Sequence, residues 1–183
     1  MADQLFATVT LIDPLAGKAF RGVAPGAASA GDAPVSHELI LDSAPQNGGQ
    51  SLGFRPMTLL ALGLAGCSGM TLIAILRKMR QVVTSYEVRV LGERSESPPR
   101  LYQHLVVEHI LAGEDLPADK VARALKLAEA ACPVSLTLSR ATSVSHSFRI
   151  VMTSTTAPDA SLAPESAAGP AAETDGSGSG LPS

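Results

Sequence analysis

The chain has 183 residues, of which 45% are hydrophobic and 17% charged, a balance typical of a globular protein. Its formal net charge of −3 gives no basic surface of the kind that binds nucleic acid. Residues 157–183 have no lysine, arginine or aromatic residue and are rich in Ala, Pro, Gly and Ser. Such a segment buries too little apolar surface to offset the entropy of ordering it. We therefore predict one domain over residues 1–156 and a disordered tail over residues 157–183.

The N-terminal residues lack the basic start and the apolar stretch of a secretory signal. Two cysteines without a larger paired framework fit a reducing compartment. We therefore expect a cytoplasmic protein. Apolar and β-branched runs over residues 5–12, 18–23 and 35–41 predict three strands, because turn and loop sequences separate them.

The most conspicuous segment is residues 55–83, in which no charged residue lies between Met57 and Leu76. Pro56 suits the first turn of a helix, so we predict a helix from there to about residue 83. A run of this length could cross a membrane. It also contains three glycines, and the sequence after it alternates as the strands of a water-exposed sheet do. We favour a helix buried in protein rather than in a membrane, and we expect dimerisation to help cover it.

Residues 85–91 and 101–111 predict two further strands, residues 115–131 a second helix, and residues 134–138 and 144–152 two closing strands. His104 and His109 fall on opposite faces of one strand and cannot bind one metal together from it. We interpret them as ordinary surface or edge histidines. His37 and His146 show no spacing that indicates a metal site.

Cys67 lies in the long apolar helix, and Cys132 ends the apolar face of the second helix. We therefore expect both thiols to point to the same core. A lone buried cysteine usually behaves as a small, inert hydrophobe. Two neighbouring thiols could instead react with a peroxide, one becoming a sulfenic acid that condenses with the other to a disulfide. The residues alone leave both interpretations open.

Three segments together resemble a known family: PMTLLALGLAGCSGMTL at 56–72, SYEVRVLGERSESPPRLYQHLVV at 85–107, and DKVARALKLAEAACPVSLTLSRA at 119–141, followed by VSHSFRI. They are similar to the OsmC/Ohr family of osmotically inducible and organic hydroperoxide resistance proteins. Both cysteines fall on the family's two cysteine positions. The resemblance implies an α+β, OsmC-like fold with antiparallel sheets around a long central buried helix, and an intertwined homodimer.

For the peroxidase members, the resemblance implies reduction of organic hydroperoxides by Cys67, a disulfide with Cys132, and regeneration by an external dithiol such as dihydrolipoamide, with no metal or other cofactor. Leu60, Leu64 and Met70 could form apolar walls for a hydrophobic peroxide. The alternative is a non-catalytic relative that binds a hydrophobic small molecule at the dimer interface.

The sequence departs from the peroxidase pattern where the family holds an arginine over the thiolate. The acid that normally holds this arginine is replaced by Met57 and Thr58. The first hairpin, residues 13–17, carries no arginine, so Arg21 is the nearest candidate, with Lys18 and Arg55 as others. A thiol with an ordinary pKa is only a few per cent ionised at neutral pH. We therefore expect weak or absent peroxidase activity.

Overall fold

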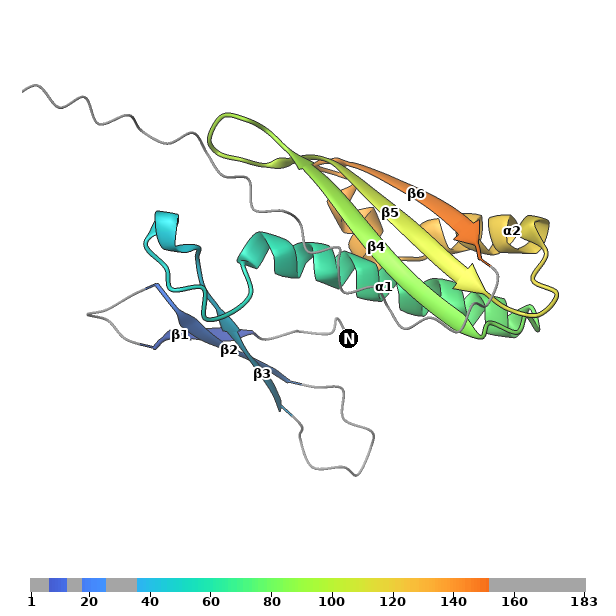
Figure 1. Ribbon diagram of the computed structural model, residues 1–183, viewed down its shortest axis with the longest axis horizontal. Coiled ribbons are helices and arrows are strands. Elements are labelled where there is room, and N and C mark those ends of the chain that lie inside the picture. Colours follow the sequence, from blue (N-terminus) through green and yellow to red (C-terminus); the bar gives the residue numbers. More distant parts are fainter. Residues whose placement is uncertain (1–6, 13–17, 26–35, 152–183) are drawn as a thin grey trace, which may run out of the picture. The chain divides into compact units, whose positions relative to one another are not determined.

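The structure is a computed structural model that describes residues 7–12, 18–25 and 36–151 (Figure 1). The predicted tail and the predicted hairpin residues 13–17 lie outside the described residues. The elements in chain order are β1 (Thr8–Leu11), β2 (Phe20–Pro25), β3 (Ser36–Leu41), η1 (Pro45–Asn47), α1 (Pro56–Lys78), β4 (Ser85–Arg94), β5 (Tyr102–Ala112), α2 (Ala118–Glu129), α3 (Pro133–Leu138) and β6 (Ser143–Ile150). The predicted α+β class is confirmed, with two three-stranded sheets among these elements.

The first sheet consists of β1, β2 and β3, each antiparallel to the next, as the sequence predicts. The chain then turns through a loop that the Asp42 carboxylate organises. That carboxylate accepts hydrogen bonds from the backbone N–H groups of Ser43, Gln50 and Leu52 at 2.7–3.0 Å. Asp42 is buried, so these bonds satisfy a charge that would otherwise be costly to bury. The loop leads directly into α1.

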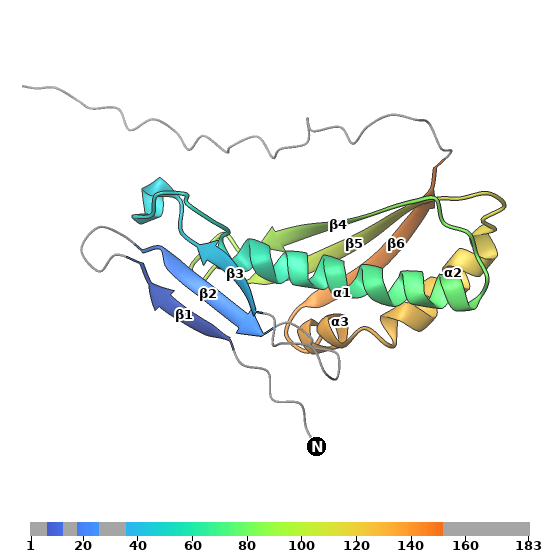
Figure 2. The same cartoon turned by 90° about the horizontal axis from the view of Figure 1, so that it is seen from below.

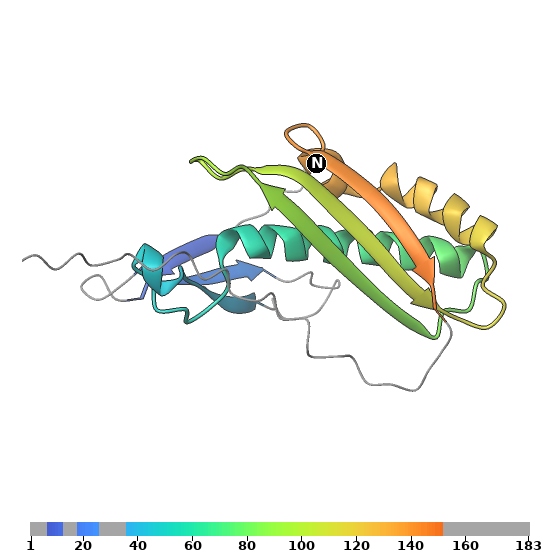
Figure 3. The same ribbon diagram turned by 45° about the horizontal axis from the view of Figure 1, so that its top comes forward.

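The second sheet corrects the expectation of purely antiparallel sheets. β4 and β5 form an antiparallel hairpin, but β6 pairs with β5 in parallel. Parallel neighbours need a crossover connection, and here α2 and α3 provide it (Figure 3). Figure 2 shows α1, α2 and α3 on the same side of this sheet. The inward face of the sheet therefore meets all three helices.

The helix α1 begins as predicted and ends earlier than predicted. Pro56 occupies its first position, where the missing N–H costs nothing. Its last residue is Lys78, because Arg80 adopts a left-handed backbone with φ of 58°. The N–H groups of Arg80 and Gln81 then bond to the carbonyls of Arg77 and Leu76, which is the Schellman arrangement that closes a helix. The sequence concealed this stop because glycine usually occupies the left-handed position.

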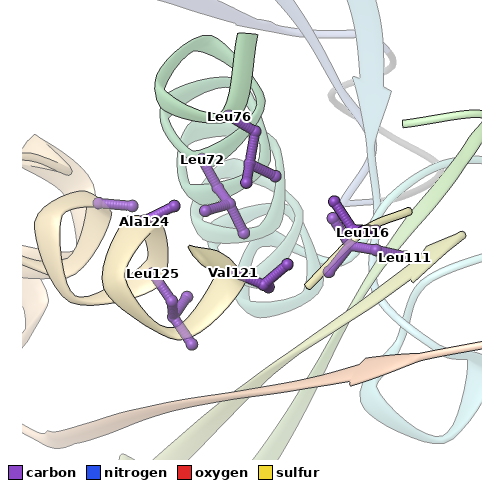
Figure 4. Packing of buried hydrophobic residues seen from close by; sticks show 8 residues of the cluster. Leu72, Leu76, Leu111, Leu116, Val121, Ala124 and Leu125 are labelled. Atoms are coloured by element: carbon purple, nitrogen blue, oxygen red, sulfur yellow. The ribbon is translucent and has the colours of Figure 1, made fainter. Parts of the chain in front are cut away.

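Hydrophobic packing joins the helices to the second sheet. The larger buried cluster takes residues from α1, β5 and α2 with the loop before α2: Leu72, Leu76, Leu111, Leu116, Val121, Ala124, Leu125 and Ala128 (Figure 4). A smaller cluster consists of Leu64, Leu105 and Val107. The one face of α2 that the sequence predicts as apolar supplies four members of the larger cluster. The clusters fix one side of α1 against its own chain.

The opposite side of α1 is not covered by the described part of the chain. Met70 is 70% exposed and Leu62 is 47% exposed, and only 28% of the most apolar stretch of the helix is buried. By length and composition alone α1 could cross a membrane. Within a single chain, α1 is thus buried on one side only, and the expectation of a helix buried in protein on every side is not met.

The prediction of a strand over residues 134–138 is wrong, because this segment is the short helix α3. Its alternating Val, Leu and Leu resemble a strand in sequence. Pro133 stands at the first helical position and Cys132 acts as the N-cap, so local capping favours the helix instead.

Candidate functional site

The site consists of the two cysteines, which the fold brings into contact from separate helices. Cys67 lies in the middle of α1, and Cys132 immediately precedes α3. Their sulfur atoms are 3.4 Å apart, and both thiols are free. Cys132 is wholly buried, whereas Cys67 is half-buried. The prediction that both thiols point to the same place is confirmed.

Local structure gives Cys132 a set of hydrogen-bond donors. As the N-cap of α3, its sulfur accepts a hydrogen bond from the Ser135 N–H at 3.5 Å. Ser68 follows Cys67 on α1, and its Oγ is also 3.5 Å from the Cys132 sulfur. The two donors come from different elements, so the tertiary packing of α3 on α1 assembles them.

The surroundings shift the two thiols in opposite directions. Burial raises the pKa of Cys67, and its contact with Cys132 adds to this, against one hydrogen bond from the Val134 N–H. Burial also acts to raise the pKa of Cys132, but the hydrogen bonds from Ser68 and Ser135 outweigh it and lower that pKa. The hydrogen bonds that favour a thiolate are therefore concentrated on Cys132.

The candidate cations lie apart from the thiols. Arg21 is exposed on β2, opposite Thr10 and Ile40, and no hydrogen bond or ion pair joins it to either cysteine in the described ranges. The Lys18 ammonium donates to the backbone carbonyl of Asn47. Arg55 is the N-cap of α1 and is exposed.

The positions that replace the family's acid contact the strands rather than the thiols. The backbone carbonyl of Met57 accepts a hydrogen bond from the Tyr102 hydroxyl at 3.0 Å. Met57 and Thr58 line one hollow together with Arg55 and Arg94. Neither residue carries a charge that could hold a guanidinium over Cys67.

The three predicted pocket residues do not share one wall. Leu64 is wholly buried in the smaller hydrophobic cluster, so it does not line an open pocket in this chain. Leu60 is 40% exposed. Met70 lines an open apolar groove of about 450 Å³ on the uncovered side of α1, which also includes Leu62, Ala65, Gly66, Gly69, Ile73, Tyr86 and Val88.

Sequence reasoning missed a row of polar side chains beside the thiols. His109 is wholly buried rather than an ordinary surface or edge residue, so that interpretation is wrong. Its Nδ1 is 2.7 Å from the Tyr86 hydroxyl and its Nε2 is 3.4 Å from Nδ1 of His146. The Nε2 of His146 is 2.9 Å from Oγ of Ser135.

One signal of this row was present in the alternation of the strands. Tyr86, His109 and His146 each occupy a core-facing position on an amphipathic strand. Their proximity depends on the register, which pairs Val88 with His109 and Val107 with His146. Within the described residues, no group of three or more His, Cys, Asp or Glu side chains is arranged to hold a metal ion.

Comparisons with known proteins agree with this architecture. A family model described as OsmC-like protein matches residues 48–147. Protein YhfA of Escherichia coli is 36% identical over 122 residues, which cover 66% of this chain and 88% of that protein.

Solved structures show the same fold. An OsmC-like protein from Mycoplasma pneumoniae has a TM-score of 0.64 at 15% identity, covering 84% of this chain and 100% of that one. An organic hydroperoxide resistance protein, OsmC, from Legionella pneumophila has a TM-score of 0.54 at 15% identity, covering 81% of this chain and 98% of that one. With the family model matching more than half of its residues, the chain belongs to the OsmC-like protein family.

Proposed function

We propose that the protein is a thiol-dependent peroxidase that reduces organic hydroperoxides with Cys67 and Cys132. The observation that carries this proposal is the 3.4 Å contact between the two free sulfur atoms. An S–S bond is about 2.05 Å long, so a small movement of side chains is enough to form it. The more accessible thiol, Cys67, meets the peroxide, and the buried thiol, Cys132, resolves the product.

The proposed reaction has three balanced steps. The Cys67 thiolate attacks one oxygen of the hydroperoxide, the O–O bond breaks, and an alcohol leaves after taking a proton, so that Cys67 becomes a sulfenic acid. The Cys132 thiolate then attacks the sulfenic sulfur, forms the disulfide and releases the oxygen as water. An external dithiol, such as a dihydrolipoamide, reduces the disulfide and is itself oxidised to a disulfide.

We also propose that the active form is a cytoplasmic homodimer in which the uncovered side of α1 is buried. Its support is the exposure of Met70 and Leu62 on a helix that the described part of the chain covers on one side. Contiguous apolar surface of this kind is rare on a monomer in water. Sedimentation of detergent-free protein tests this proposal, and recovery only in detergent would favour a membrane helix instead.

Mass spectrometry of the reduced protein treated with one equivalent of cumene hydroperoxide tests the peroxidase. We expect an intramolecular disulfide between Cys67 and Cys132, with the mass of two hydrogen atoms lost. Cys132→Ser should stop at a sulfenic acid on Cys67 that dimedone traps, and Cys67→Ser should not consume the peroxide. Peroxide consumption at the original rate in Cys67→Ser would contradict the assignment.

The open apolar groove around Met70 supports a second candidate function, the binding of a hydrophobic small molecule without catalysis. This function predicts that a fluorescent fatty acid binds equally well before and after Cys67→Ser. It also predicts that cumene hydroperoxide leaves both thiols reduced. The peroxidase predicts the opposite result for the thiols.

A further inference from the structure

Four polar side chains form a continuous row from β4 to α3, and its last member, Ser135, contacts Cys132. The row runs from Tyr86 through His109 and His146 to Ser135, with successive polar atoms 2.7, 3.4 and 2.9 Å apart. The two imidazole rings are nearly parallel, at 14° and 5.7 Å between centroids. The row crosses three strands and ends on the helix that Cys132 caps.

Burial makes this row a unit rather than four separate contacts. His109 has no exposed surface, and a buried polar atom without a partner is costly. Burial and the neighbouring His146 lower the pKa of His109 to about 4, so its ring is neutral and has one donor and one acceptor. All hydrogens can then point one way. Tyr86 donates to His109, His109 to His146, and His146 to Ser135.

Ser135 connects the row to the reactive sulfur. It is 5% exposed, its Oγ meets His146, and its backbone N–H donates to the Cys132 sulfur at 3.5 Å. The helix α3 has only six residues, and helices this short are unstable unless other elements hold them. The hydrogen bond from His146 on β6 therefore holds the first turn of α3 in place, and this turn contains the Ser135 N–H.

We propose that Tyr86, His109, His146 and Ser135 form a positioning row that holds the Ser135 N–H on the Cys132 sulfur and so prepares Cys132 to resolve the Cys67 sulfenic acid. Its part in resolution rests on the proposed peroxidase function. Its effect on the ionisation of Cys132 does not depend on that function. The row acts on the sulfur through the position of one donor, the Ser135 N–H.

A second pair on the same strands provides a matched control. His104 on β5 contacts Oγ of Ser145 on β6 through its Nε2 at 3.2 Å. His104 lies five residues before His109, so it points to the other face of the strand, and no hydrogen bond in the described ranges joins this pair to a cysteine. Glu129 and Lys126 on α2 line a hollow together with His146, and both are left unsubstituted in every variant.

Ultraviolet titration of the thiolate tests the row in the full chain carrying Cys67→Ser, where Cys132 is the only thiol. A blank that lacks both cysteines removes the absorbance of the tyrosines. We expect Ser135→Ala and His146→Phe to decrease the thiolate roughly tenfold at neutral pH, which is about one pKa unit. His146→Gln, which keeps a side-chain donor, should retain most of the thiolate, and His104→Gln should match the parent.

The proposal is overturned if Ser135→Ala titrates as the parent does, or if His104→Gln loses as much thiolate as His146→Phe. Circular dichroism checks folding, and if His146→Phe does not fold, Ser135→Ala and His146→Gln decide the outcome. Peroxide enters only in a separate arm, with both cysteines present. Failure of the unmodified protein to form the disulfide there would reject the peroxidase and leave the titration result standing.

Discussion

Removing the Ser68 hydroxyl should slow the resolving step without blocking the first one. Ser68 is 2% exposed, and its Oγ lies 3.5 Å from the Cys132 sulfur. A hydrogen bond to a charged group contributes about 1.5–3 kcal/mol. The contact is long, so we take the lower end, which equals about one pKa unit and roughly a tenfold decrease in thiolate.

The assay follows the reduced protein after rapid mixing with one equivalent of cumene hydroperoxide, with dimedone trapping the sulfenic acid and intact mass reporting the disulfide. In Ser68→Ala we expect the sulfenic acid on Cys67 to accumulate, because disulfide formation is about tenfold slower. Thr71→Val is the control, since its hydroxyl donates to the Cys67 carbonyl and not to a sulfur. Equal disulfide rates in Ser68→Ala and the parent, or equal slowing in both variants, would refute this reasoning.

Three further predictions concern stability and assembly. Leu72→Ala should lower the free energy of unfolding by about 2–5 kcal/mol in urea titrations, because Leu72 is wholly buried in the larger cluster, whereas Leu127→Ala, at a half-exposed position on α2, should cost far less. The folded-state pKa of His109 is about 4 against an ordinary 6.5, so the unfolded chain binds the proton first. This difference in pKa stabilises the folded protein fully above pH 6.5, and the stabilisation is lost as the pH falls towards 4. The free energy of unfolding should decrease by about 3 kcal/mol over this range. A free energy of unfolding that stays constant from pH 6.5 to pH 4 would contradict this prediction. Met70→Asp should convert the proposed dimer to a monomer in sedimentation experiments, while Lys126→Asp on exposed α2 should not. A dimer in both variants would place the interface elsewhere.

Met57 and Thr58 carry no charge that could hold a cation over Cys67, so the proposed reaction depends on the surroundings of the two sulfurs themselves. No cation in the described ranges is hydrogen-bonded to Cys67, and burial raises its pKa. Cys132 instead has the donors and the lower pKa. We therefore expect slow attack on the peroxide and efficient resolution afterwards, a combination that limits further oxidation of the Cys67 sulfenic acid.

The sequence by itself determined the elements whose signals are local. The uncharged run after Pro56 indicated α1, apolar spacing indicated one face of α2, and alternation indicated β4 and β5. Two cysteines in matching contexts indicated the family, one within the long apolar helix and one at the end of an apolar face. The local signals misled in two places. Alternation indicated a strand where capping by Cys132 and Pro133 forms α3, and the end of α1 was hidden because Arg80 takes a conformation that glycine usually takes.

Only the tertiary structure decided which side chains meet. His109 and His146 are 37 residues apart, and the parallel register of β5 with β6 puts them on the same face of the sheet. Ser68 and Ser135 meet one sulfur because α3 packs on α1. Strand periodicity gives the face of a residue but not its partner on the next strand, since register depends on packing and on the crossover. For the same reason, the sequence could pair the two cysteines, but it could not say that Cys132 has the donors.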